Sequence, residues 1–331
     1  MNRLKRLCLY SLYGITINIQ ADIKESMHQY YKDKKVLVTG GCGFIGSHLV
    51  EKLVSYGAHV TILDDLSTGS LENIQSCKDK IFFIQGSITD KEVCRSAVAD
   101  NTHLFHLAAF ISVPQSLEDP STCHTINING TFNILEASRG THVQRFIFSS
   151  SSAVYGTPEG KCSEESPCNP ESPYGFSKLI GEELCLQFNH CYGLETVALR
   201  YFNVFGDRQN PDGQYAAVVA KFTNLINQNR PVTIFGDGLQ TRDFIPVDQV
   251  VMANLLVGMA PSNALKERVF NVATGKSITL LELFEQLKER FPHYQLAPQF
   301  LPARSGDIKE SSADCSRLAG LLNQSSFFCY T

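Results

Sequence analysis

Residues 35–48 read KVLVTGGCGFIGSH and combine three signals in one short stretch. The apolar run at residues 36–38 has the length and composition of a buried strand. Gly40, Gly43 and Gly46 follow at three-residue intervals, and apolar residues then recur at helical spacing from Phe44 to Tyr56. The stretch therefore predicts a strand, a glycine turn and a helix. In that arrangement the glycines let the backbone approach a pyrophosphate at the N-terminus of the helix.

Asp64 indicates which dinucleotide the loop would bind. It follows directly on the next predicted strand, His59–Leu63, and opens the sequence DDLSTG. An acidic side chain at this place accepts hydrogen bonds from the hydroxyls of an adenosine ribose and repels a 2′-phosphate. No arginine occurs in residues 64–69, so NAD is favoured over NADP. The plainer alternatives are a turn-forming aspartate and a glycine loop without a ligand.

The order of the predicted elements indicates an α/β fold. Strand-like and helix-like segments alternate from residue 35 to about residue 201. The further strands are expected at Ile81–Ile84, Leu104–Leu107, Arg145–Ser149 and Thr196–Tyr201, and the helices at Lys91–Ala99, Asn127–Ser138 and Pro173–Tyr192. Such alternation predicts a Rossmann-like, doubly wound parallel sheet that binds its ligand at the carboxyl ends of the strands.

The pattern changes after Asn203. Loops rich in Gly, Asp and Asn separate two expected helices, Ala216–Asn227 and Leu280–Phe291, and a short strand, Thr233–Phe235. We therefore expect residues 35–202 to form an NAD-binding domain. Residues 203–331 are expected to form mainly a smaller α+β domain for the substrate, with some segments returning to the first domain.

The composition, net charge and cysteine pattern of the chain argue against several classes of protein. The chain has 331 residues, of which 43% are hydrophobic and 19% charged, and its net charge is −4. This balance gives no reason to expect nucleic acid or an acidic membrane as a partner. Its 11 cysteines are scattered without a CxxC pair, which argues against a metal site and against a disulfide framework. The cysteine pattern suits a reducing compartment, and a cytoplasmic location is expected.

The first 34 residues are interpreted as an arm of uncertain status. Basic residues at positions 3, 5 and 6 precede the run Leu7–Ile19, which polar residues interrupt too often for a membrane span. No convincing cleavage site of a signal peptide follows. We expect either a disordered arm or an upstream start codon, with Met27 as the working start.

Two short motifs suggest catalysis. Tyr174 and Lys178 lie one helical turn apart if Pro173 begins a helix. An ammonium group beside a phenol stabilises the phenolate, so Lys178 is expected to lower the pKa of Tyr174 and make it a proton acceptor. The serines at positions 149–152 end the fifth predicted strand, where a hydroxyl can meet a substrate.

At this point a family resemblance becomes specific. The chain resembles the extended short-chain dehydrogenases/reductases, and within them the nucleotide-sugar 4-epimerases of the UDP-glucose or UDP-N-acetylglucosamine type. The matching segments extend from about residue 35 to 315: VTGGCGFIGSHL, LDDLSTG, HLAAFISVPQS, NINGTFNILEA, FIFSSSSAVYG, SPYGFSKLIGE, LRYFNVFG, IFGDGLQTRDFIPVDQV and ARSGD.

The resemblance implies roles for individual residues. The catalytic residues would be Ser151, Tyr174 and Lys178. Contacts to NAD are implied for Gly40, Gly43, Phe44, Ile45, Gly46, Asp64, Ser67, Thr68, Gly69, Ser87, Ile88, Leu107, Ala108, Ala109, Asn127, Tyr174, Lys178 and Tyr201. Contacts to the UDP-sugar are implied for Ser112, Ser151, Ser152, Asn203, Ala217, Val218, Phe235, Gly236, Arg242, Arg304, Asp307 and Ser311.

The resemblance also implies a mechanism, in which C4 of the sugar is transiently oxidised by bound NAD and hydride returns to the opposite face. Ser152 and Ala153 stand where related 4,6-dehydratases carry Asp and Glu, which argues against water loss. Ser87 replaces a common Asp, and the C-terminus is shorter than is usual in the family, so the substrate domain could be weakened. A dehydratase, a decarboxylase and a non-catalytic NAD-binding protein remain alternatives.

Two expectations concern the substrate and the oligomer. Strictly glucose-type enzymes resemble one another in carrying a tyrosine where this chain has Ser311, and a small side chain there leaves room for an N-acetyl group. We therefore expect UDP-N-acetylhexosamines to be accepted, alone or beside UDP-glucose and UDP-galactose. A homodimer is implied by the resemblance, through the helices expected at Asn127–Ser138 and Pro173–Tyr192.

Overall fold

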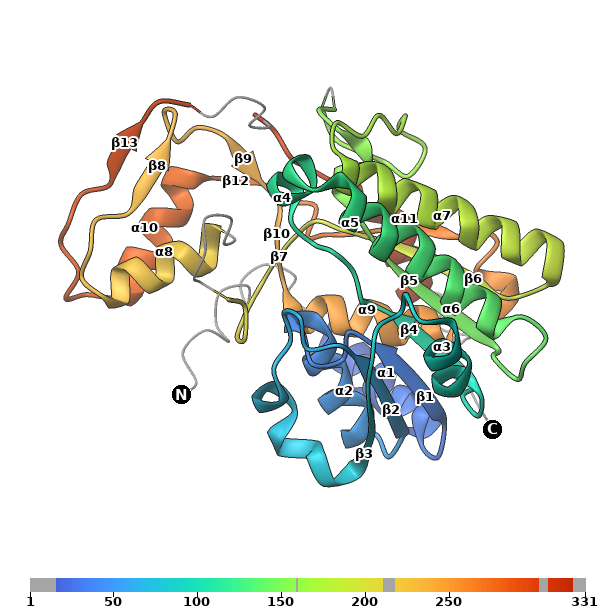
Figure 1. The fold of residues 1–331 in the computed structure, drawn as a ribbon. Coiled ribbons are helices and arrows are strands. Elements are labelled where there is room, and N and C mark those ends of the chain that lie inside the picture. The colour runs from blue at the N-terminus through green and yellow to red at the C-terminus, as the bar shows by residue number, and fades with distance from the viewer. Residues whose placement is uncertain (1–15, 159, 211–217, 304–308, 324–331) are drawn as a thin grey trace.

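A parallel sheet forms the centre of the molecule. The computed structural model describes residues 16–158, 160–210, 218–303 and 309–323. Within these residues seven parallel strands are ordered β11-β6-β5-β4-β1-β2-β3 (Figure 1). Their bounds are β1 Lys35–Thr39, β2 His59–Asp64, β3 Ile81–Gln85, β4 His103–His106, β5 Arg145–Ser151, β6 Thr196–Tyr201 and β11 Val269–Val272. The strand order reverses between β1 and β4, and a ligand crevice opens at such a point.

Helices cover both faces of this sheet. On one face lie α1 Thr16–Tyr31, α2 Phe44–Ser55 and α9 Val247–Met259, and on the other α3 Lys91–Val98, α6 Thr131–Ser138 and α7 Pro173–Tyr192. Val36 and Val38 pack on the first face and Leu37 on the second, because successive side chains of a strand point to opposite sides. The expected doubly wound α/β fold is confirmed.

A smaller lobe lies beside the carboxyl ends of the strands (Figure 1). It contains β8 Thr233–Phe235, β9 Thr241–Arg242, β12 Ile278–Thr279, β13 Gln299–Leu301, α8 Val218–Asn227 and α10 Leu280–Arg290. Its own apolar core includes Phe222, Ile234 and Phe284. The short pair β7 Asn203–Phe205 and β10 Phe244–Pro246 connects this lobe to the sheet.

Short elements complete the connections. They are η2 Leu71–Lys80, α4 Val113–Glu118, α5 Pro120–His124, η3 Thr125–Gly130, η4 Ser152–Tyr155, η5 Ser262–Ala264 and α11 Ser316–Asn323. Among the described helices, none combines the length and the hydrophobicity needed to cross a bilayer.

The bounds of α7 agree with the expected helix because both ends carry strong local signals. Ser172 caps the N-terminus by accepting a hydrogen bond from the backbone N–H of Gly175, and Pro173 occupies the first turn. Gly193 ends the helix in the left-handed conformation, at φ 69°. Tyr174 and Lys178 are therefore held in the first turns of a well-defined helix.

Helix α9 and strand β11 are among the elements of the large domain that were not expected from the sequence. Helix α9 is buried on almost every side, so its sequence has no polar face to reveal a helical period. Strand β11 pairs with β6, although the two lie far apart in the chain. Both follow residue 203, so the part of the chain assigned mainly to the substrate domain also builds the NAD-binding domain.

The expectation of a disordered arm is wrong for residues 16–31, which form helix α1. Ile23, Met27 and Tyr31 repeat at intervals of four residues and are all buried against the sheet and α9. The hydroxyl of Tyr31 donates a hydrogen bond to the carbonyl of Leu255 in α9, at 2.8 Å. Apolar periodicity over only three positions is weak evidence in a sequence, but the contacts make it a docked helix.

Candidate active site

The glycine loop between β1 and α2 has the shape of a phosphate cradle. Gly40 adopts φ 70°, which disfavours any side chain, and a Cβ at Gly46 would lie 2.1 Å from the carbonyl oxygen of Gly40. Gly43 begins α2 without a side-chain cap. The first N–H groups of a helix have no partner within it, so this end of α2 offers donors to a pyrophosphate.

Asp64 lies at the end of β2, next to this loop. Its carboxylate accepts hydrogen bonds from the backbone N–H groups of Cys42 at 2.8 Å and Leu66 at 2.9 Å. Burial raises the pKa of Asp64, and the two N–H groups act in the opposite direction. One carboxylate thus joins the glycine loop to the DDLSTG loop, and together they fit the adenosine half of NAD.

Other residues of the predicted cofactor set lie in the loops that follow β2, β3 and β4. Ala108 touches the glycine turn, because a Cβ at Gly40 would lie 2.7 Å from the Ala108 nitrogen. Gly69 packs on Cys42 in the same close manner. Ile88 is buried under Gly130, and the hydroxyl of Ser87 pairs with Thr89. The remaining members adjoin these residues in the chain: Phe44, Ile45, Ser67, Thr68, Leu107 and Ala109.

Asn127 uses its polar atoms within the protein. Its side-chain oxygen accepts a hydrogen bond from the Phe110 N–H at 2.7 Å, and its amide donates to the Phe110 carbonyl and to Ser177. It therefore pins the loop after β4 to helix α7. A direct contact of Asn127 with NAD stays a prediction, and the structure supports a role in shaping the site.

The three proposed catalytic residues come from β5 and α7. Ser151 ends β5, and its hydroxyl accepts a hydrogen bond from the Ala153 N–H at 3.2 Å. Tyr174 lies in the first turn of α7, with its ring centroid 5.9 Å from the Lys178 ammonium nitrogen. That nitrogen donates to the carbonyl of Ser149 at 2.8 Å. The strand end and the helix start thus bring a hydroxyl, a phenol and an ammonium group together.

The expected effect of Lys178 on Tyr174 differs in the structure. Burial is the largest influence on Tyr174 and raises its pKa, while the Ser151 hydroxyl lowers it and Lys178 is not among the causes. Burial also lowers the pKa of Lys178 to about 8. The sequence predicts that the two groups lie one turn apart, but it does not reveal how far burial removes water from around them. The expected lowering of the Tyr174 pKa by Lys178 is therefore not found in this structure, and the role of Tyr174 as proton acceptor stays a prediction.

The substrate residues are divided between the two lobes. Asn203 donates a hydrogen bond to the Asp243 carbonyl at 3.0 Å, next to Arg242 of β9. The N–H of Ser311 donates to the Thr241 carbonyl at 3.1 Å, so Ser311 lies alongside the same strand.

The other predicted substrate residues begin, end or adjoin separate elements. Phe235 ends β8, Gly236 follows at φ 77°, and Val218 begins α8. Ser112 caps α4, and Ser152 begins η4. Ala217, Arg304 and Asp307 lie outside the described residues.

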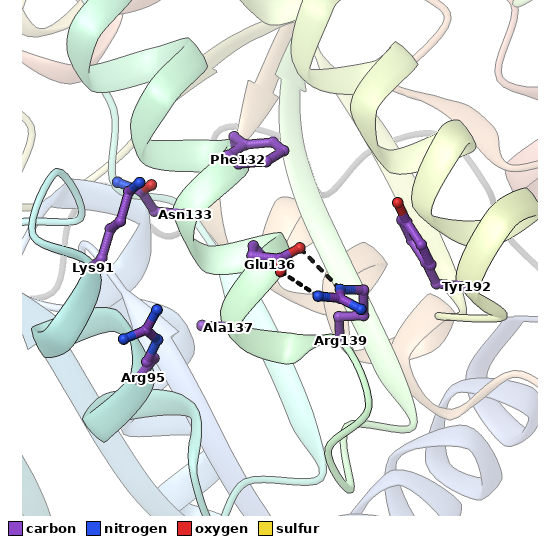
Figure 2. Close-up of a pocket in the computed structure, with 8 residues that line it drawn as sticks. All are labelled: Lys91, Arg95, Phe132, Asn133, Glu136, Ala137, Arg139 and Tyr192. Atoms are coloured by element: carbon purple, nitrogen blue, oxygen red, sulfur yellow. Dashed lines mark hydrogen bonds and ion pairs between the residues drawn. The ribbon is translucent and has the colours of Figure 1, made fainter.

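A separate surface groove of about 460 Å³ lies between α3, α6 and the end of α7. Figure 2 shows Arg139 paired with Glu136 and facing Tyr192 in this groove. None of the residues that line it belongs to the predicted site. The groove is therefore distinct from the site at the strand ends.

Sequence reasoning missed a buried charged pair behind the site. Glu182 accepts hydrogen bonds from Nη2 of Arg200 at 2.7 Å and from Nε of Arg200 at 2.9 and 3.2 Å, and a further one from the hydroxyl of Ser150. The pair links α7, β6 and β5. Glu182 lies one turn after Lys178, so a second charge at helical spacing on the same inner face was the available signal.

A protein-family model and a known relative both match most of this chain. The model of the NAD dependent epimerase/dehydratase family matches residues 36–273. The UDP-glucose 4-epimerase of Mycolicibacterium smegmatis is 38% identical over 293 residues, covering 87% of this chain and 92% of the relative.

Two solved structures are similar over most of their length. One is the UDP-N-acetylglucosamine 4-epimerase of Methanobrevibacter ruminantium in complex with UDP-N-acetylmuramic acid, with a TM-score of 0.83, 40% identity, and coverage of 88% of this chain and 92% of that chain. The other is the UDP-glucose 4-epimerase of Thermotoga maritima with UDP-glucose, with a TM-score of 0.81, 38% identity, and coverage of 89% and 98%.

Proposed function

The chain belongs to the NAD dependent epimerase/dehydratase family of short-chain dehydrogenases/reductases, and from this premise we propose that it is an NAD-dependent 4-epimerase of UDP-hexoses. The observation that carries the proposal is the meeting of Ser151, Tyr174 and Lys178 at the carboxyl end of β5, on the sheet edge that also holds the glycine cradle. The named relatives and structural neighbours act on UDP-sugars, which supports the substrate class.

In the proposed reaction the protein's own groups handle one proton. The reaction requires Tyr174 as its phenolate, the form that the hydrogen bond from Ser151 favours. This phenolate takes the proton of the 4-hydroxyl of the sugar, while Ser151 donates a hydrogen bond to O4 and stabilises the charge that develops there. Lys178 orients the cofactor ribose. When bound, NAD supplies a reversible hydride acceptor. After the keto sugar turns over, Tyr174 returns its proton to O4, so the reaction is redox-neutral overall.

A screen of purified full-length protein tests this function. UDP-glucose, UDP-N-acetylglucosamine and their 4-epimers are supplied singly, without added reductant, and the products are separated and weighed by mass spectrometry. Epimerisation leaves the mass unchanged, whereas loss of water by a dehydratase gives a lighter product. Retained NAD with no turnover of any of the four sugars would contradict the proposal and favour a non-catalytic NAD-binding protein or a decarboxylase, which needs a sugar with a carboxylate.

Ser311 is proposed to set the width of the sugar pocket. It lies beside Thr241 and Arg242, and its carbonyl is held by the Ser277 hydroxyl at 2.7 Å. In the variant Ser311→Tyr, a phenol ring would fill the space proposed for the N-acetyl group. We expect kcat/KM for UDP-N-acetylglucosamine to fall by about 10- to 100-fold. Turnover of UDP-glucose by the same variant is the internal control, and unchanged use of UDP-N-acetylglucosamine would refute the pocket assignment.

A homodimer through α6 and α7 is proposed as well. Large apolar side chains are exposed on and near these helices, among them Phe132, Phe176 and Tyr192. An exposed apolar face of this kind is typical of a protein–protein interface. Light scattering on the full chain is expected to give the mass of two subunits. A monomer mass at micromolar concentration would contradict this.

A cytoplasmic location is the last part of the proposal. The nine cysteines in the described residues are all free thiols, which suits a reducing compartment. A fluorescent fusion of the full chain is expected to fill the cytoplasm, and secretion of the fusion would contradict this.

A further inference from the structure

The ammonium group of Lys178 is held by a backbone carbonyl on a neighbouring strand. Its nitrogen donates to the carbonyl oxygen of Ser149, two residues before Ser151, at 2.8 Å. Both residues are buried, so the contact is shielded from water. A lysine side chain has four rotatable bonds and places its charge loosely unless partners hold it. The position of the Ser149 peptide therefore decides where the charge of Lys178 lies.

Ser149 is held on its other side by a chain of side-chain hydrogen bonds. Its hydroxyl lies 3.0 Å from the hydroxyl of Tyr201 in β6, and that hydroxyl lies 2.9 Å from Oδ1 of Asn254 in α9. The amide of Asn254 donates to the carbonyl of Val250 at 2.8 Å. Ser149, Tyr201 and Asn254 come from three different elements, β5, β6 and α9. The chain of hydrogen bonds therefore crosses from the sheet to the helix layer.

The directions of these hydrogen bonds follow from the chemistry of the groups. Oδ1 of a carboxamide only accepts, so Tyr201 donates its proton to Asn254. The oxygen of Tyr201 is then an acceptor, and the hydroxyl of Ser149 donates to it. Burial raises the pKa of Tyr201 to about 12, so the phenol keeps its proton at neutral pH. Every hydroxyl in the chain thus has a defined role.

We propose that Tyr201 and Asn254 are positioning residues, which fix Ser149 and, through its carbonyl, the ammonium group of Lys178. Ser149, Tyr201 and Asn254 are together called the lysine brace. The resemblance implied that Tyr201 contacts NAD, but its hydroxyl is committed to protein partners on both sides. The influence of this hydroxyl on the cofactor is accordingly indirect, and a contact of NAD with the ring or backbone of Tyr201 stays a prediction. The inference rests on the proposed role of Lys178 toward the cofactor ribose.

The structure supplies a matched pair of variants for the test. Tyr201→Phe removes one buried hydroxyl from the last residue of β6. Thr196→Val removes one buried hydroxyl from the first residue of the same strand, where it donates to the Cys185 carbonyl at 2.7 Å. Tyr201→Phe removes two buried hydrogen bonds and Thr196→Val removes one, so both variants should lose some stability. Only Tyr201→Phe breaks the lysine brace.

Three quantities are measured on each purified holoprotein: the rate at which NAD leaves, and kcat and KM for the UDP-sugar. In Tyr201→Phe we expect NAD to leave about tenfold faster and kcat to fall about tenfold, because the brace is lost. KM for the UDP-sugar should stay within about twofold, since the brace includes none of the residues implied to contact the UDP-sugar. In Thr196→Val all three should stay within about twofold of wild type, because no catalytic group is touched.

The proposal would be refuted if the NAD release rate and kcat of Tyr201→Phe stay within about threefold of those of Thr196→Val. A difference that small can be explained without any positioning of Lys178. If Tyr201→Phe does not fold, Ser149→Ala deletes the same hydrogen bond and carries the same expectations. NAD release is informative even if no UDP-sugar is turned over. A wild-type protein without turnover but with faster NAD release in Tyr201→Phe would refute the proposed function and leave the brace supported.

Discussion

Tyr174→Phe is expected to lower epimerase turnover by about 10³-fold, since a positioned general base contributes on the order of 10²- to 10⁴-fold. The change removes only the phenol oxygen, which as phenolate would accept the proton of the sugar. The helix start is retained, because the N–H of residue 174 still donates to the Ser116 hydroxyl, which lies 3.2 Å from it. Bound NAD should be retained, so the loss should appear in kcat rather than in cofactor content.

Single-turnover assays with UDP-glucose and UDP-N-acetylglucosamine measure this loss directly. Tyr192→Phe is the matched control, because Tyr192 ends the same helix and is 54% exposed, far from the proposed site. It should turn over at the wild-type rate. Turnover of Tyr174→Phe equal to that of Tyr192→Phe would mean that another group accepts the proton.

Tyr31→Ala is expected to lower the free energy of unfolding by about 3–5 kcal/mol, the usual loss for a large buried aromatic side chain. Tyr31 is completely buried, and its ring centroid lies 6.5 Å from that of Phe105 in β4. Its hydroxyl fits against Gly258, where a Cβ would lie 2.2 Å away, and donates to Leu255. Truncation would leave a cavity and remove this hydrogen bond at the same place.

Denaturant unfolding of the full chain measures this effect. Gln29→Ala changes an exposed residue of the same helix and should alter the free energy of unfolding by less than about 0.5 kcal/mol. A loss below about 1 kcal/mol in Tyr31→Ala would show that α1 adds little to the folded state, since a packed aromatic side chain contributes more than this.

The main sheet could be predicted from the sequence because its signals are local. Apolar strands alternate with helices at short intervals, and each helix of the βαβ units begins or ends with recognisable residues. Ser172, Pro173 and Gly193 are such signals, and the bounds of α7 follow from them. The strand bounds differ by no more than two residues at either end, because strand ends depend on pairing with neighbours rather than on propensity.

Helices α1 and α9 could not be found in this way. Helix α9 lacks a polar face because α1, α2 and the sheet surround it, and α1 has a recognisable apolar face only where α9 meets it. Each of the two helices explains the burial of the other. This kind of evidence is absent from either segment alone.

The sequence determines the local chemistry of the chain. It spaces the glycines of the first loop so that the backbone can make a close approach, and it places Asp64 after the second strand and Tyr174 one turn before Lys178. The tertiary structure alone decides how these groups behave. Burial sets the pKa of Tyr174 and of Lys178, and it depends on all the elements packed around them. The contact of Lys178 with Ser149, and of Ser149 with Tyr201 and Asn254, joins residues that are distant in the chain and meet only when the sheet and helices are assembled.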